Sequence, residues 1–274
     1  MQKTIKLTVL VNNNVYSSGL QAEHGWSLLA ETADGLILFD LGQSDLFRKN
    51  AAILGCDLEK VDKVVLSHGH YDHTGGLDSF LSLNPGATIY AHPDVFKKRF
   101  SVEAGKKTRE IGMPDTVRKY LDSFCLNPKP SQIFPDVFLT GEIRRKSDPG
   151  EINKGLYSDL DGKELDYVLD DQAIILNTGL GFVVLLGCCH SGLANTLESV
   201  AEITGERQFY MVLGGMHLSK APEDILRETV QCLNKFHVKK VGHAHCSGWL
   251  GMQALKQFFS GEVFSCDVGK TIKI

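Results

Sequence analysis

The sequence lacks any apolar run long enough to cross a membrane. No stretch reaches the roughly 18 uncharged apolar residues of a membrane span, and the N-terminal run LTVLV stops after five residues at three asparagines. That run is too short for a signal-peptide core. The seven cysteines are odd in number and show no disulfide-framework spacing. We therefore expect a reduced, cytoplasmic protein that does not bind membranes.

The sequence also lacks an excess of positive charge and the motifs of nucleotide cofactors. Its net charge is −4, which argues against a general nucleic-acid binder. There is no GxGxxG or Walker-type loop, no repeat at a solenoid period and no low-complexity tract. We expect a small molecule rather than a nucleic acid as the partner, and the oligomeric state stays open.

Strands and helices alternate along most of the 274 residues. Alternating apolar residues predict a strand at 4–11, and 26–42 predicts a hairpin with its turn at Asp34-Gly35. Further strands are expected at 61–68, 87–92, 171–178, 181–190, 208–217 and 239–245, and a strand or hairpin at 262–274. Helices are expected at 45–54, 77–83, 193–203, 222–236 and 249–259. This order predicts an α/β sandwich, with two facing sheets and helices outside.

The segment 95–165 differs from the rest of the chain. It holds five of the eight prolines, many charges and only weak periodicity. We expect a single domain over 1–274 in which this segment is an insertion or cap.

Residues 66–76, LSHGHYDHTGG, place three histidines and an aspartate within six positions directly after a predicted strand. Imidazole is the commonest metal ligand. His68 and His70 lie two residues apart and share one side of an extended chain. Asp72 and His73 follow where the chain turns, and point to a neighbouring position. The sequence therefore predicts a metal-binding loop.

A catalytic divalent site usually takes three protein ligands and keeps one position open, so later residues must contribute. Four histidines follow predicted strands, at whose ends such ligands converge: His190, His217, His243 and His245. His237 leaves a helix, and a capping or surface role fits it better. His24 and His92 are the remaining candidates.

The stretch His68-Gly69-His70-Tyr71-Asp72-His73 resembles the HxHxDH signature of the metallo-β-lactamase superfamily. GCCHSG at 187–192 and AHCSG at 244–248 resemble its later histidine segments, and Asp40 matches its strand-end aspartate. The resemblance implies the four-layer αβ/βα sandwich. It implies one ion held by His68, His70 and His190, and a second held by Asp72, His73 and His245, with His243 as the less favoured alternative to His245. Asp40 would support the loop through hydrogen bonds.

The sequence departs from the common pattern at one position. Many members have an aspartate that bridges both ions at the end of the strand after the third histidine. Here QFYMVLGGMH offers Gly214, Gly215 and then His217, without a carboxylate. We therefore expect a weaker second ion site. His217 is a candidate ligand, acid or substrate contact, and a strand-end hydrogen-bonding role is the alternative.

The neighbouring cysteines have simpler interpretations. Cys188 and Cys189 are expected to fill the interior of a strand. Cys246 is expected to be a thiolate if it reaches the metal.

Four phrases, EHGWS, DDQAIIL, LGGMHL and GHAHCSG, are similar to proteins related to the dihydropterin ribofuranosylaminobenzene 5′-phosphate synthase of methanopterin biosynthesis. The wider family implies a hydrolase that uses a metal-bound hydroxide, with Zn²⁺ first and Mn or Fe also accepted. Asp72 would orient the water and His217 would protonate the leaving group. The alternatives are a synthase that releases pyrophosphate and a metal- or ligand-binding protein with little turnover.

The segment 97–119 carries eight Lys and Arg residues against three acids, and Arg144-Arg145-Lys146 follows. If this segment covers the metal site, it favours an anionic, phosphorylated substrate, with Lys106, Lys107 and Arg109 as contacts. A solvated charged surface is the alternative.

Overall fold

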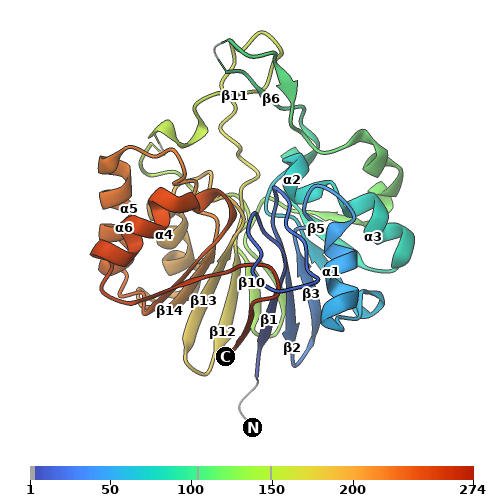
Figure 1. Cartoon of the computed structure of the whole chain (residues 1–274), viewed down its shortest axis with the longest axis horizontal. Helices are drawn as coiled ribbons and strands as arrows, with labels where there is room; N and C mark the ends of the chain where they lie inside the picture. Colours follow the sequence, from blue (N-terminus) through green and yellow to red (C-terminus); the bar gives the residue numbers. More distant parts are fainter. Residues whose placement is uncertain (1–3, 104, 149) are drawn as a thin grey trace.

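Two seven-stranded sheets lie face to face in the computed structural model, which describes residues 4–103, 105–148 and 150–274 (Figure 1). The first sheet has the order β17 (Thr271–Lys273), β1 (Lys6–Val11), β2 (Ser27–Thr32), β3 (Gly35–Phe39), β4 (Lys63–Val65), β5 (Thr88–Ala91) and β8 (Phe124–Leu126). The second has the order β16 (Glu262–Ser265), β15 (Lys240–His243), β14 (Phe209–Gly214), β13 (Gly181–Leu186), β12 (Ile174–Thr178), β10 (Val137–Leu139) and β9 (Ser131–Phe134).

Apolar residues on both faces of each sheet build three core layers. The inner faces meet in one cluster that joins Leu7 and Phe39 of the first sheet to Leu185 and Leu213 of the second. Helices α1 (Leu46–Leu54) and α3 (Leu77–Leu83) cover the outer face of the first sheet. Helices α4 (Leu193–Thr204), α5 (Glu223–Lys235) and α6 (Gly248–Phe258) cover the outer face of the second. The predicted four-layer sandwich is therefore confirmed.

Local sequence signals explain where several elements begin and end. Gly55 ends α1 in the left-handed conformation, with φ of 70°, and donates its N–H to the carbonyls of Ala51 and Ala52. Pro222 directly precedes α5. The β2–β3 turn is one residue earlier than predicted: it uses Ala33 and Asp34, while Gly35 already pairs with Thr32.

The C-terminal segment does not form a hairpin. β16 pairs in parallel with β15 in the second sheet, whereas β17 pairs antiparallel to β1 in the first. The last strand thus crosses between the sheets. Ile272 and Ile274, at the end of the chain, pack against the core between the two sheets.

The segment 95–165 is only partly a cap. β6 (Phe100–Ser101), β7 (Arg109–Glu110) and β11 (Leu156–Tyr157) form a small separate sheet over the end of the sandwich that lies opposite the two chain termini (Figure 1). β8, β9 and β10 instead extend the two main sheets. The cap is therefore narrower than the sequence suggested, because alternating apolar residues such as Ile133, Val137 and Leu139 belong to the central core.

The remaining helical segments are α2 (Tyr71–Thr74), η1 (Leu58–Lys60), η2 (Pro93–Phe96), η3 (Asp115–Ser123), η4 (Gly150–Asn153) and η5 (His245–Ser247). Within the described ranges, no helix is long and apolar enough to cross a membrane.

Candidate metal centre

The predicted histidines meet at the carboxyl ends of the parallel strands. Strands β3 and β4 of the first sheet end at one edge, and β13, β14 and β15 of the second end opposite them beneath the cap. Loops after parallel strands are where α/β sheets usually bind ligands. The loop after β4 leads into α2, and His190, His217 and His245 follow β13, β14 and β15.

Three buried imidazoles lie next to one another. The ring centres of His68, His70 and His190 lie 4.6, 4.8 and 4.9 Å apart. His68 Nε2 lies 2.9 Å from His70 Nδ1. His190 Nδ1 lies 2.8 Å from Asn153 Oδ1, but Nε2 of His70 and Nε2 of His190 are buried without a hydrogen-bond partner. Because buried polar atoms are normally paired, these nitrogens fit a ligand-binding role.

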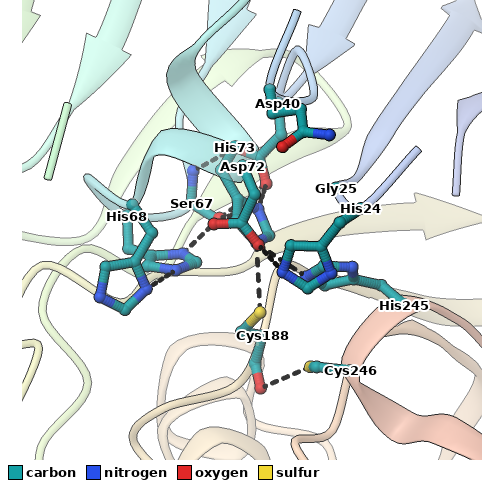
Figure 2. A network of polar contacts seen from close by, with 12 residues as sticks. His24, Gly25, Asp40, Ser67, His68, Asp72, His73, Cys188, His245 and Cys246 are labelled. Carbon is teal, nitrogen blue, oxygen red and sulfur yellow. Dashed lines mark hydrogen bonds and ion pairs between the residues drawn. The ribbon is translucent and has the colours of Figure 1, made fainter. Parts of the chain in front are cut away.

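A second group forms around the Asp72 carboxylate (Figure 2). Asp72 Oδ2 lies 3.0 Å from His24 Nε2, 3.2 Å from His245 Nε2 and 3.9 Å from His73 Nε2. His24, Asp72 and His245 form one group of possible metal ligands. The sequence named His24 only as one of the remaining candidates, since it lies in a loop far from the signature and no spacing connects the two.

Burial sets the protonation of the first group. It lowers the pKa of His68, His70 and His190 well below the ordinary value, and nearby cationic groups add to this effect. These rings are therefore neutral at physiological pH, which is the form that binds metals.

In the second group, burial opposes the charged forms but the ion pairs outweigh it. Asp40 and Asp72 raise the pKa of His73 to about 9. His73, His24 and His245 together hold the pKa of Asp72 well below its ordinary range. A negative charge on Asp72 therefore persists inside the site.

Asp40 holds the loop by hydrogen bonds, as expected. Its carboxylate accepts bonds of 2.7 Å from the Ser67 N–H and from the Ser67 hydroxyl, and lies 2.7 Å from His73 Nδ1. The third contact leaves His73 Nε2 directed into the site. Asp40 itself adopts a left-handed φ of 57°, a cost that these three bonds offset.

The loop backbone is anchored by a buried arginine. Gly69 donates its N–H to Asp170 Oδ2 at 2.7 Å, and Arg99 Nη1 donates to the same oxygen at 3.0 Å. Arg99 is 1% exposed and also pairs with Asp166 at 2.9 Å. Arg99 therefore supports the loop and adds nothing to the positive surface that the basic segment was expected to form.

The other histidines differ in whether they lie near the candidate metal ligands. His217 has a ring centre 4.6 Å from that of His190, and its Nδ1 is buried without a partner. His243 is absent from every ligand group found among the described residues, whereas His245 belongs to two. His92 caps η2 by accepting the Asp94 N–H, and His237 follows α5 in a left-handed turn.

The position of Cys188 contradicts the prediction that it fills the interior of a strand. β13 ends at Leu186, so Cys188 lies in the following loop, and its sulfur is 3.1 Å from His73 Nε2. Cys189 does pack in the core beside α4. The alternation of β13 could not be extended to these residues, because Cys189 adopts a φ of 60° and breaks it.

The sulfurs of Cys188 and Cys246 belong to one group of possible metal ligands, together with His217. Burial raises the pKa of Cys188 well above that of an ordinary thiol. Burial also acts against ionisation of Cys246, but hydrogen bonds with Cys188 and His217 hold its pKa well below the ordinary value. Cys246 Sγ accepts the His217 N–H at 3.2 Å.

The basic residues of the cap divide between two cavities. Arg109 lines the cavity over the imidazoles, which has a volume of about 140 Å³, and its guanidinium lies 5.3 Å from the centre of the Tyr71 ring. Lys106 and Lys107 line an adjoining cavity of about 270 Å³, to which Arg109 also contributes. Lys106 is already paired with Glu103.

The fold is that of the metallo-beta-lactamase superfamily. The family model "Metallo-beta-lactamase superfamily" matches residues 20–180, and the chain belongs to this family, whose members bind divalent metals. The chain is 30% identical to the 7,8-dihydropterin-6-methyl-4-(beta-D-ribofuranosyl)-aminobenzene-5'-phosphate synthase of Methanocaldococcus jannaschii, over 94% of this chain and 92% of that protein.

Solved structures show the same fold. The crystal structure of Tm1679, a metal-dependent hydrolase of the beta-lactamase superfamily, is 29% identical and superposes with a TM-score of 0.83 over 98% of this chain and 99% of that one. The metallo-beta-lactamase fold protein YhfI of Bacillus subtilis, at 16% identity, covers all of both chains with a TM-score of 0.61.

Proposed function

We propose that this protein is a metal-dependent hydrolase that acts on a small anionic, phosphorylated ester. The observation that carries the proposal is the cluster of buried, neutral imidazoles of His68, His70 and His190, in which Nε2 of His190 has no hydrogen-bond partner. A buried polar nitrogen without a partner lowers the stability of the fold unless a ligand binds it.

The donor set fits two divalent ions. His68, His70 and His190 would hold the first ion, and Asp72, His73 and His245 the second. Nitrogen and carboxylate donors suit Zn²⁺, and Mn or Fe accept the same mixture. When bound, such ions polarise the scissile group and lower the pKa of water to about 7.

The protein's own groups supply the remaining chemistry. Asp72 keeps its negative charge next to the cavity and would orient the water by accepting a hydrogen bond from it. Although burial disfavours its charged form, His217 has a raised pKa because of Cys246, so it can carry a proton to the leaving group. Arg109 at the cavity wall offers a positive charge to a phosphate.

The test is hydrolysis of bis(4-nitrophenyl) phosphate by metal-loaded protein. We expect release of nitrophenol that disappears in the double variant His68→Ala/His70→Ala, while Arg109→Ala mainly raises KM. His237→Asn is the matched control, because His237 lies at the end of α5 in a left-handed turn that asparagine tolerates. Equal turnover in the double variant and the parent would refute the hydrolase.

A synthase reaction is the second candidate, and the similarity to the M. jannaschii enzyme favours it. The same two ions would then bind a pyrophosphate leaving group. Incubation with a dihydropterin pyrophosphate and a phosphorylated ribosylaminobenzene should release pyrophosphate. If no pyrophosphate is released at high enzyme concentration, the synthase reaction is refuted. A fully metallated protein that turns over neither substrate class would be a binding protein instead.

A further inference from the structure

We infer that the Cys188 thiolate is a ligand shared by both metal ions, in the place of the missing bridging carboxylate. The inference rests on the proposed two-ion site and extends it. It assigns a third kind of donor, sulfur, to a centre otherwise built from imidazole and carboxylate.

The first argument is position. Cys188 forms one group of possible ligands with His68 and His190, and another with His73 and His245. Within each group, all ligand atoms lie within 4.8 Å of one another. Cys188 is the residue that these two groups have in common, and Figure 2 shows its sulfur directed toward His73 and Asp72.

The second argument is that the neighbouring strand cannot provide the bridge. A Cβ added at Gly214 would lie 2.1 Å from the Leu186 carbonyl oxygen. A Cβ at Gly215 would lie 2.4 Å from the Gly187 oxygen and 2.6 Å from Cys246 Sγ. Gly214 and Gly215 therefore have no room for a side chain, whereas the β13 loop that packs against them carries the Cys188 sulfur.

The third argument is charge. Two dications that share a site repel each other, and an anion between them lowers that repulsion. Asp72 lies beside the second group, next to His24 and His245. The shared position is left to Cys188, which is 3% exposed and loses its thiol proton to solvent when the sulfur binds the ions.

Cys246 is the natural comparison. Its sulfur groups with Cys188 and His217 but with none of the imidazoles assigned to the two ions. It therefore lies behind Cys188, and Cys246→Ala tests whether any sulfur signal comes from the second cysteine. Cys189→Ala is the matched control, since Cys189 packs in the core and lies outside the site.

The deciding experiment uses reduced, metal-free protein titrated with ¹¹³Cd²⁺ and with Co²⁺. With cadmium, the ¹¹³Cd resonances of both ions should lie toward the chemical-shift region of thiolate-bound cadmium. In Cys188→Ser, both resonances should lie in the region of nitrogen- and oxygen-bound cadmium. With cobalt, the sulfur-to-metal charge-transfer absorbance should rise through two equivalents in the parent, Cys246→Ala and Cys189→Ala.

Affinity provides a separate readout. Cys188→Ala should weaken the second ion by about 10- to 100-fold or more, whereas Cys188→Asp should keep two ions without the charge-transfer band. A single shifted cadmium resonance would overturn the sharing. Two bound ions without any thiolate signal would overturn the inference and leave the proposed hydrolase intact. Failure to bind ions would refute both the inference and the proposed function. The wild-type spectrum decides even if a variant does not fold.

Discussion

At the scale of single residues, three of the predicted histidine ligands are oriented by a second polar group. His73 Nδ1 faces Asp40 at 2.7 Å, His190 Nδ1 faces Asn153 at 2.8 Å, and His245 Nδ1 faces Asn13 at 2.8 Å. Each contact leaves Nε2 free to face the site. Partners of this kind fix ring orientation and raise ligand basicity.

His24 orients the Asp72 carboxylate in the same way: its Nε2 lies 3.0 Å from Asp72 Oδ2. His24→Ala should lower turnover of bis(4-nitrophenyl) phosphate by about 10- to 100-fold. His237→Asn should leave turnover unchanged. Steady-state kinetics with parallel metal analysis measure the effect, and full activity in His24→Ala would show that the contact is incidental.

Asp171 should make the metal-free protein less stable as the pH rises. Burial raises its pKa to about 6, and it accepts the Ser191 N–H at 2.7 Å. The folded state therefore holds this proton more tightly than the unfolded state, so ionisation costs stability. The penalty is absent below about pH 4 and is complete above about pH 6, where it is on the order of 3 kcal/mol.

Asp171→Asn removes this penalty while it keeps an acceptor oxygen. Its free energy of unfolding in urea, relative to the parent, should therefore increase between pH 4 and pH 7. The exposed control Asp122→Asn should show a flat difference. A flat difference for Asp171→Asn as well would mean that this carboxyl is not perturbed in the metal-free protein.

At the scale of elements, the site is made by loops that need close backbone approach. Gly69 separates His68 from His70, and a Cβ there would lie 2.1 Å from the Val95 carbonyl oxygen and 2.8 Å from Arg99 Nη1. The segment after β5, which carries Val95 and Arg99, therefore presses on the metal loop. The loop can take its shape only with glycine at this position.

Gly69→Ala should lower the free energy of unfolding by about 1–3 kcal/mol and weaken metal binding, because the loop must move. Gly86→Ala is the matched control: it lies in an exposed turn, with Asn84 Oδ1 at 3.8 Å as the nearest atom. Its effect should stay within about 0.5 kcal/mol. Urea unfolding and metal analysis of both variants provide the comparison.

At the scale of the whole molecule, the proposed ions join the two sheets. His68, His70 and His73 follow β4 of the first sheet, while His190 and His245 follow strands of the second. Each ion would take ligands from both. Metal binding should therefore stabilise the folded sandwich, because the site does not exist in the unfolded chain.

Chelation should lower the melting temperature. At ion concentrations about 1,000 times Kd, the linked stabilisation is about 4 kcal/mol, which corresponds to roughly 5–15 °C for a chain of this size. Calorimetry with and without chelator measures the shift. The variant His68→Ala/His190→Ala, which lacks two of the three ligands of the first ion, should show a smaller chelator effect than the parent. An equal chelator effect in that variant would place the stabilising ion elsewhere.

The four-layer fold and the converging histidines could both be predicted from the order and spacing of residues along the chain. Strand and helix periodicity is local, and HxHxDH lies within six residues, so both can be seen without a structure. Pairing of the 124–139 strands with the main sheets depended on long-range contacts, and the cap was overestimated for that reason.

The residues that surround the ligands could not be predicted in this way and are known only from the folded chain. His24, Asn13 and Asn153 come from loops that no spacing connects to the signature. Cys188 was assigned to a strand interior because alternation was carried past Leu186, where the left-handed turn at Cys189 redirects the chain. Side chains brought together by packing leave no periodic trace in the sequence, since their separation along the chain is arbitrary.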